Sequence, residues 1–432
     1  MIHEPELAVV ARSGANAKGT TTGKGATSSI RAIVREGAAV RSGARAALWC
    51  VVSATLLAAL VAGRSASAKP TTTLRRFALV VGSNNGGRDR VLLRYATTDA
   101  SRVARVLRDL GGVATEDVAL LVEPDRSALE RSFEVLAARM AGSSAGARRE
   151  VVFYYSGHSD EEGLLLGGAR FEYATLRTKL AAVPAEVRVA IVDSCASGAL
   201  VRRKGGVRRP PFLLDSSADI AGTAILTSSS ADEASQESDR IGGSFFTHFL
   251  LSGLRGAADV SRDRRVTLNE AYQFAFQETL ARTERTASGA QHAAYDMQLA
   301  GAGDLVLTDL RGTAASLVLA EDVQGRLFVR DAAGRLVAEL RKSGDRVIEL
   351  GLDPGEYEIT LENQGRVSAT RLRLVEGRSV RLEATLLRST PIEPTVARGE
   401  AGEPAVTSTA AADESLTPIS ISLLPPLSFG RG

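Results

Sequence analysis

Short apolar runs alternate with amphipathic stretches along residues 77–310, and this alternation predicts the first domain. Five runs are almost continuously apolar, as expected of strands that are buried on both faces of a sheet. These predicted strands cover residues 77–84, 117–124, 150–157, 187–195 and 223–230. Apolar residues at helical spacing predict helices within residues 97–112, 126–142, 175–183, 244–255 and 268–282.

A hairpin around Gly167 and Gly168 and a last strand over residues 304–310 complete this domain. Strands that alternate with helices indicate the α/β class, with a mostly parallel sheet flanked by helices. We place the domain at residues 75–310.

The pattern changes at residue 315, where short alternating strands separated by glycine-containing turns replace the helices. Seven such strands fit within residues 315–387, which predicts a small all-β sandwich domain. This region contains no His, no Cys and no clustered polar site, which favours a structural or binding role. Residues 389–432 are rich in Pro, Glu, Thr, Ser and Ala, and we expect a disordered tail.

The N-terminal part carries a candidate targeting segment at residues 46–68. An apolar run over 46–62 follows several arginines and precedes Ala66-Ser67-Ala68, a pattern that is typical of a secretory signal cleaved before Lys69. We therefore expect an exported protein, either periplasmic or secreted. The alternative is an uncleaved membrane anchor, although this run would reach only about 26 Å as a helix. Residues 1–45 are interpreted as disordered, or as the result of a start site assigned too early.

The composition limits which partners and which reactive groups we expect. The net charge is only +3, so no nucleic-acid partner is expected. The chain has two cysteines, Cys50 within the predicted signal and Cys195. If the signal is removed, Cys195 is the single thiol of the mature protein, and no internal disulfide is possible.

Two of the predicted strands end in loops that carry reactive side chains. One continues into Ser156-Gly157-His158, and the other ends at Asp193-Ser194-Cys195. Sites in open α/β sheets form beyond the carboxyl ends of strands, so neighbouring strands would bring His158 and Cys195 together. A thiol needs a base to become a thiolate at neutral pH, and histidine suits that task. This predicts a cysteine peptidase with Cys195 as nucleophile and His158 as base.

The segments YYSGHSDEEG and DSCASG resemble the His and Cys motifs of the caspase-like peptidases, which include caspases, metacaspases, paracaspases and bacterial relatives (peptidase C14 type). The resemblance covers about residues 75–310 and includes ALVVGSN, TTDASRVARVL, TSSSADEASQES and SFFTHFLLSGLRGAAD. It implies a caspase–hemoglobinase fold and peptide-bond hydrolysis by a Cys–His dyad. Most relatives have Gly after the catalytic His, and its N–H lines the oxyanion hole together with that of the nucleophile. Ser159 occupies this position here, so the resemblance implies Ser159 and Cys195 as the oxyanion donors.

The resemblance also bears on specificity. Caspases that cut after Asp use Arg in the first pocket, whereas metacaspases and paracaspases cut after Arg or Lys and use acidic residues. The matching positions are Asp99, Asp193 and Glu233, all acidic in this chain. We therefore predict cleavage after Arg or Lys. The alternative for each carboxylate is a helix cap or a surface residue, above all for Asp99, which opens a helix.

Residues 259–270 have the spacing of an EF-hand calcium loop, with Asp259, Ser261, Asp263 and Glu270 at positions 1, 3, 5 and 12. Position 6, which needs Gly for the sharp turn, is Arg264. We favour a decayed loop and expect no cofactor, with calcium as the alternative. No zinc-ligand spacing, dinucleotide fingerprint or P-loop is present.

Two alternatives to a general endopeptidase remain open. One is an inactive caspase-like scaffold that binds proteins through its β-sandwich. The other is a self-processing peptidase, because the loop VRRKGGVRRPP (201–211) follows the nucleophile and contains five Arg or Lys residues. The expected partner is a protein or peptide substrate, with a membrane only if the N-terminal segment is uncleaved. The sequence does not specify the oligomeric state.

Overall fold

The computed structural model describes residues 73–142, 147–201, 220–230, 233–301 and 303–389, all of which belong to one compact unit. The predicted signal segment 46–68 and residues 1–45 lie outside these ranges, as do residues 202–211 of the basic loop and residues 390–432 of the tail. Within the described ranges, no helix has the length and apolar character that crossing a membrane requires.

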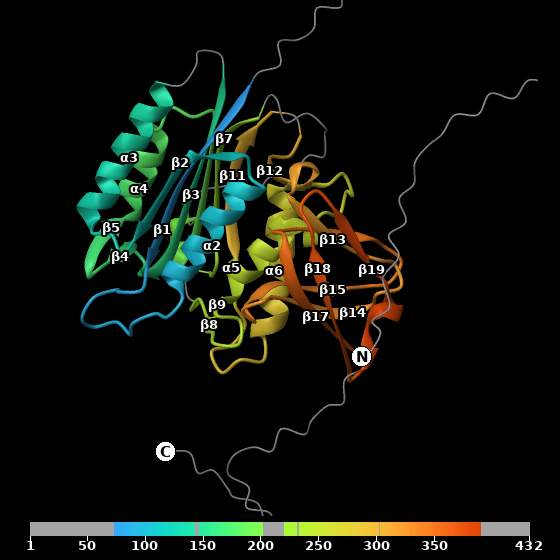
Figure 1. Cartoon of the computed structure of the whole chain (residues 1–432). Helices are drawn as coiled ribbons and strands as arrows, with labels where there is room; N and C mark the ends of the chain where they lie inside the picture. Colours follow the sequence, from blue (N-terminus) through green and yellow to red (C-terminus); the bar gives the residue numbers. More distant parts are fainter. Residues whose placement is uncertain (1–72, 143–146, 202–219, 231–232, 302, 390–432) are drawn as a thin grey trace, which may run out of the picture. The chain divides into compact units, whose positions relative to one another are not determined.

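A six-stranded main sheet forms the centre of the first domain, in the order β11-β7-β6-β3-β1-β2 (Figure 1). Its strands are β1 (Leu74–Ser83), β2 (Val113–Val122), β3 (Arg148–Ser159), β6 (Val187–Asp193), β7 (Ala221–Thr227) and β11 (Ala294–Ala300). The first five run parallel, and β11 pairs antiparallel with β7. The predicted hairpin is β4 (Gly163–Leu166) with β5 (Ala169–Glu172), which extends β3. The mostly parallel sheet is thus confirmed.

Helices cover both faces of this sheet, which explains why its strands are continuously apolar. One face packs against α2 (Ala96–Asp109), α5 (Phe245–Ser252) and α6 (Leu268–Thr283). The other packs against α3 (Arg126–Ala141) and α4 (Tyr173–Ala182). Side chains of β1 alternate between the two cores, with Ala78 and Val80 on the first and Phe77 and Leu79 on the second.

The predicted last strand over residues 304–310 is confirmed as a strand. That segment forms β12 (Val306–Asp309), which pairs with β10 (Arg265–Thr267) in a separate two-stranded sheet. The two edges of the main sheet are β2 and β11, and the sequence pattern did not predict β11. Residues of β11 are mostly half-buried at the sheet edge, so polar and apolar residues mix along it and no apolar run marks it.

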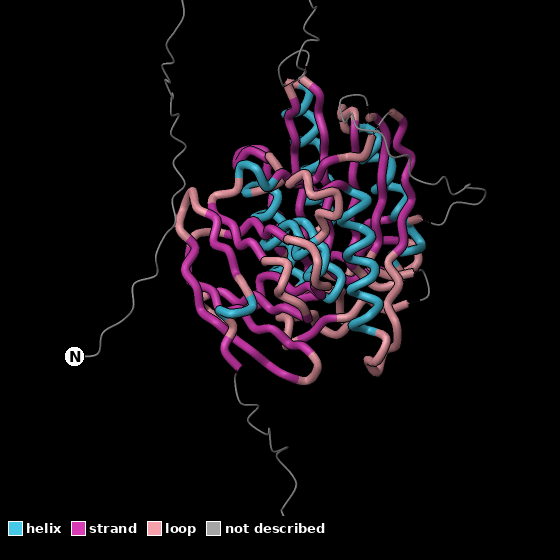
Figure 2. Tube along the Cα trace, turned by 90° about the vertical axis from the view of Figure 1, so that its right-hand side faces the viewer, coloured by secondary structure: helices cyan, strands magenta, loops and turns pink. Residues whose placement is uncertain are grey.

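The C-terminal region is built almost entirely of strands, which Figure 2 draws in magenta. They form two further sheets, and one apolar core lies within this region. One has the order β16-β13-β19 and the other β15-β14-β17-β18-β20. Their bounds are β13 (Ala315–Leu319), β14 (Gly325–Asp331), β15 (Leu336–Lys342), β16 (Ile348–Leu352), β17 (Gly355–Asn363), β18 (Arg366–Leu374), β19 (Ser379–Leu382) and β20 (Arg388–Ser389). All seven predicted strand segments contain an observed strand, and β20 is additional.

This β region packs directly onto the first domain. Phe274 of α6 contacts the cores of both, and Ala257 belongs to the core of the β region. Ala257 ends a π-helical turn, Gly253–Ala257, that follows α5. The described residues therefore form a main sheet with its helices and a β region that share a packed junction.

Candidate active site

The register of the sheet places the two predicted catalytic residues at the same edge. Strands β3 and β6 are parallel neighbours, and Ser156 pairs with Asp193 at their carboxyl ends. His158 and Cys195 each follow two residues after this pair. Both side chains are partly exposed, as a site open to substrate requires.

The loop after β1 holds the imidazole of His158. Its Nε2 lies 2.7 Å from the carbonyl oxygen of Val91. Gly86 packs against the same ring, since a Cβ at Gly86 would lie only 2.5 Å from ring carbons of His158. A carbonyl can only accept, so Nε2 carries the proton, and Nδ1 is left as the acceptor of the neutral ring. Nδ1 is therefore the nitrogen that can act as base.

Cys195 lies in a short turn whose backbone is unusual. Ala196, the next residue, has a φ of 51°, in the left-handed region that non-glycine residues seldom adopt. The N–H of Ala196 donates to the carbonyl of Glu233 at 3.0 Å. Burial raises the pKa of the Cys195 thiol, and the charge of Arg90 acts in the opposite direction. The thiol thus depends on a base or a nearby cation to become a thiolate.

Ser159, which follows His158, joins the loop of His158 to the loop of Cys195. Its hydroxyl lies 2.7 Å from Oγ of Ser194 and also donates a short hydrogen bond to the carbonyl of Cys195. Its side chain is buried. On the other side of His158, Oη of Tyr155 donates to the His158 carbonyl at 2.7 Å. The role of the Ser159 N–H in an oxyanion hole remains a prediction.

Asp99 and Asp193 converge although they are far apart in sequence. Ser244 contacts both, because its N–H donates to Oδ2 of Asp99 at 2.9 Å and its hydroxyl donates a short hydrogen bond to Asp193. Asp193 also accepts from Ser235 at 2.7 Å. Both carboxylates are buried, with exposed fractions of 1% and 3%. Oδ1 of Asp99 receives no hydrogen bond from the described residues, and Arg102 lies 3.8 Å from it.

Burial is the main cause that raises the pKa of Asp99 well above its usual range, and the neighbouring Asp193 adds to it. The nearby cation Arg102 acts in the opposite direction and lowers this pKa in part.

Glu233, the third predicted carboxylate, is engaged elsewhere. Its Oε1 lies 2.8 Å from Nδ1 of His292, and its Oε2 accepts from the backbone N–H of His292 at 2.8 Å. Although burial opposes it, these hydrogen bonds from His292 lower the pKa of Glu233. The structure thus brings together two of the three predicted carboxylates, and pairs the third with a histidine.

A hairpin covers the Asp99 carboxylate and is fastened to the loop that holds His158. It consists of β8 (Glu237–Ser238) and β9 (Gly243–Ser244). A Cβ at Gly243 would lie 2.6 Å from Oδ1 of Asp99, so the hairpin backbone sits directly on this carboxylate. Asp239 at the hairpin tip forms an ion pair with Arg94 and accepts from Oη of Tyr95 at 2.7 Å.

The candidate calcium loop uses its carboxylates internally. Oδ1 and Oδ2 of Asp259 accept from the N–H groups of Arg262 and Arg264 at 2.7 and 3.0 Å. Glu270 accepts from Thr267 as part of a capping box at the start of α6. Within the described residues, no group of three or more acidic, His or Cys side chains has the arrangement of a metal site.

Sequence reasoning missed several residues that hold the site. Val91 contributes a backbone carbonyl, which leaves no signal in residue type. Gly86 lies in a glycine-containing turn after the first strand, and this turn was the only available hint. Thr247 and Ser244 support Asp193 through hydroxyls, and such residues are common on any helix start.

The first domain of this chain is similar to known proteins. Residues 75–295, about half of the chain, match the family described as Caspase domain (Peptidase_C14). The crystal structure of caspase-1 from Spodoptera frugiperda is similar with a TM-score of 0.40 and 16% identity, covering 55% of this chain and 91% of that chain. The structure of pro-sf-caspase-1 has a TM-score of 0.37 and 15% identity, covering 55% of this chain and 92% of that one. No curated protein matches this chain.

Proposed function

The chain belongs to the caspase domain family, and from this we propose that it is a cysteine endopeptidase in which Cys195 is the nucleophile and His158 the base. The family is one of cysteine peptidases that act on protein substrates. The observation that carries the proposal is the register of β3 and β6, which gives His158 and Cys195 equal offsets beyond a paired position.

The proposed reaction follows from the hydrogen bonds of His158. Its Nε2–H is fixed on Val91 O, so Nδ1 accepts the proton of the Cys195 thiol. The thiolate attacks the substrate carbonyl carbon, and the N–H groups of Cys195 and Ser159 stabilise the oxyanion. His158 then returns the proton to the leaving amine as the C–N bond breaks. Water, deprotonated by the same nitrogen, hydrolyses the thioester and restores the thiol.

We propose that the substrate residue before the cleaved bond is Arg or Lys. Asp99 and Asp193 support this, because both are acidic, adjacent and held by Ser244. Oδ1 of Asp99 receives no hydrogen bond from the described residues, and it would accept from the substrate cation in exchange for its ion pair with Arg102. Glu233 contributes less, since His292 occupies its carboxylate.

Wild type and Cys195→Ala, incubated with a mixed peptide library, test both parts. We expect cleavage by wild type alone, with Arg or Lys before the new carboxyl terminus. Cleavage after Asp with Arg peptides left intact would overturn the specificity. Equal cleavage by both proteins would overturn the role of Cys195, and no cleavage by either would favour the inactive-scaffold alternative.

We further propose that the protein is exported, because residues 46–68 have the pattern of a secretory signal. We also propose, as a second point, that catalysis needs no metal. The carboxylates of the 259–270 loop support the second point, because backbone N–H groups already occupy them. Calorimetric titration with calcium tests it. Heat of binding in wild type that disappears in Asp263→Ala would show a working calcium loop and contradict the proposal.

A further inference from the structure

A cavity of about 440 Å³ lies where α2 and the end of α5 meet the loops of the β region. Its size falls within the range of about 300–1,000 Å³ that small-molecule sites occupy. Four arginines line it: Arg102 and Arg105 on α2, Arg255 on the π-helical turn, and Arg335 on the loop before β15. Leu336 and Tyr357 add apolar surface.

Arg255 is the buried cation of this cavity. It is only 7% exposed, and its one hydrogen bond runs from Nη1 to the carbonyl of Gly351 at 3.2 Å. It forms no ion pair with any residue in the described part of the chain. A guanidinium has five N–H donors, so most of them lack a protein acceptor. Burying a charge without a partner is costly, and burial lowers the pKa of Arg255 for the same reason.

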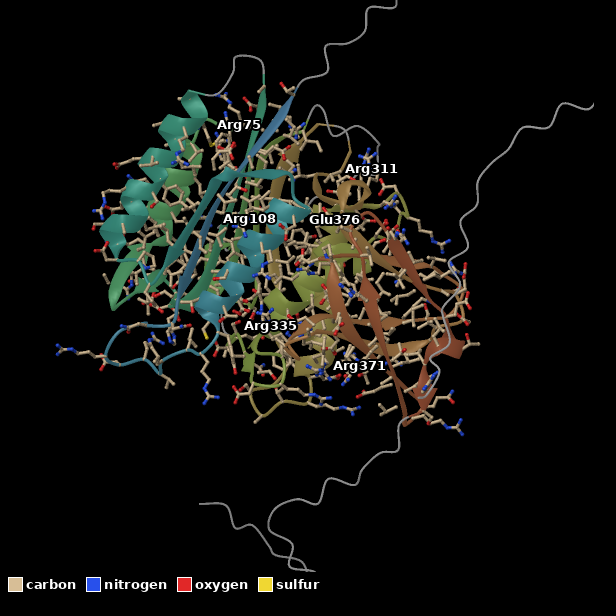
Figure 3. The ribbon with its side chains drawn as sticks, in the orientation of Figure 1. Arg75, Arg108, Arg311, Arg335, Arg371 and Glu376 are labelled. Carbon is tan, nitrogen blue, oxygen red and sulfur yellow. The ribbon has the colours of Figure 1, made fainter. Side chains whose placement is uncertain are left out.

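The other arginines differ in how far they are already satisfied. Arg102 donates to the carbonyl of Gly242 at 2.9 Å. Arg105 is exposed and makes no hydrogen bond or ion pair with the described residues. Arg335 lies on the side of the β region that faces α2 (Figure 3), where it pairs with Asp331 at 2.7 Å. Arg102 and Arg105 therefore retain donors for a ligand, whereas Arg335 is largely occupied.

Carboxylates also line the cavity, and the charge of Asp353 opposes the effect of burial on the pKa of Arg255, but no carboxylate of the described residues forms an ion pair with Arg255. Asp331 is bound to Arg335, and neither Asp353 nor Glu356 forms an ion pair with a described residue. Four arginines against three carboxylates leave a net charge of +1 on the lining. His248 lines the cavity as well, and burial lowers its pKa, so its imidazole adds no charge at neutral pH.

We propose that this cavity binds a small organic anion of phosphate or carboxylate chemistry, whose negative group pairs with Arg255 between Arg102 and Arg105. Guanidinium groups bind both kinds of anion through paired N–H donors. The apolar part of the ligand packs on Leu336 and Tyr357. Arg102 also lies 3.8 Å from Asp99, so the same cation borders both this cavity and the proposed specificity carboxylate.

Binding is measured on the Cys195→Ala protein, so that the result does not depend on the proposed peptidase activity. Inorganic phosphate, adenosine monophosphate and citrate are titrated by calorimetry, and melting temperature is followed against chloride at equal ionic strength. We expect at least one of them to bind and raise the melting temperature. Adenosine monophosphate binding more tightly than phosphate identifies a phosphate ester, and preferred citrate identifies a carboxylate ligand.

Arg255→Met tests the buried cation directly, because methionine removes the charge and retains much of the volume. We expect this variant to melt at a higher temperature than its parent in chloride, and to bind anions at least about tenfold more weakly, or 1.4 kcal/mol. Arg105→Ala should weaken binding without a change in melting temperature in chloride. Arg108→Ala, on the same helix but outside the cavity lining, is the matched control and should change neither.

Two results would overturn the proposal. The first is that none of the three anions binds to the Cys195→Ala protein or raises its melting temperature. The second is binding that Arg105→Ala and Arg255→Met leave as strong as in Arg108→Ala. If Arg255→Met does not fold, the comparison of Arg105→Ala with Arg108→Ala decides alone.

Discussion

The proposed catalytic edge, meaning the strand ends that carry His158 and Cys195, and the junction with the β region both contain buried polar groups, but different contacts hold them together. At the catalytic edge, hydroxyls and backbone carbonyls make most of the contacts, as in Ser159 to Cys195 and Tyr155 to His158. At the junction, apolar packing surrounds a network of buried charges. Glu339 of β15 is fully buried, with Arg326 at 2.5 Å, Arg282 at 3.3 Å and His248 at 3.5 Å.

This difference predicts that the two regions contribute to different properties, one to the rate of the reaction and the other to stability. The neutral hydrogen bonds that join the His158 and Cys195 loops contribute about 0.5–1.5 kcal/mol each, so loss of one of them costs little stability. A buried ion pair is different, because removal of one partner leaves an uncompensated charge. We therefore expect changes at the catalytic edge to alter rates, and changes at the junction to alter stability.

The largest expected effect comes from replacing, one at a time, the histidine of each region with glutamine. His158→Gln removes the proposed base, and we expect kcat/KM to fall about 10²- to 10⁴-fold, the usual contribution of a general base, with melting temperature unchanged. His248→Gln removes an aromatic ring from the junction, and should lower the melting temperature while the folded protein keeps its kcat. A loss of rate in both variants, or of stability in both, would break the comparison.

Glu339→Gln tests how much the buried charges at the junction contribute to the free energy of unfolding. Arg326 and Arg282 would lose their buried carboxylate, and we expect about 3–5 kcal/mol less free energy of unfolding in a denaturant titration. Glu358→Gln is the control, since its partner Arg371 is 85% exposed and such surface pairs are worth about 0–1 kcal/mol. Equal effects of the two variants would contradict a charge-held junction.

Ser159 offers a smaller test at the catalytic edge. Ser159→Ala and Ser159→Gly both remove the hydroxyl that joins the His and Cys loops, and both keep the backbone N–H. We expect kcat to fall by up to about tenfold with KM unchanged, as loss of one or two hydrogen bonds predicts. Activity equal to wild type in both variants would show that the hydroxyl does not position Cys195.

The two regions also differ in how far the sequence predicts them. The strands β3 and β6 are marked by apolar runs, and their ends by His158 and Cys195, so topology alone brings the pair to one edge. Val91 acts through its backbone, and no residue type could have indicated it. The burial of Glu339 at the junction could not be predicted from the sequence either. Glu339 alternates with apolar neighbours along β15, which is the pattern of a residue that faces solvent.

The smallest effect concerns the pH dependence of substrate choice. Burial raises the pKa of Asp99, so at low pH its carboxyl is neutral and attracts a substrate cation weakly. As pH rises through that pKa, the carboxylate forms and binding of Arg strengthens. Burial also raises the pKa of the Cys195 thiol, which makes the rate on every substrate rise with pH.

The Asp99 contribution is isolated by comparing two peptides that differ only in Arg or citrulline before the cleaved bond. Citrulline keeps the shape of arginine without its charge, whereas the thiol affects both peptides alike. We expect the ratio of their kcat/KM values to rise by only a few-fold with pH in wild type, and to stay flat in Asp99→Asn. A ratio that falls with pH, or that rises equally in Asp99→Asn, would show that Asp99 does not receive the substrate cation. The buried carboxylates of the catalytic edge would then serve structure, as those of the junction do.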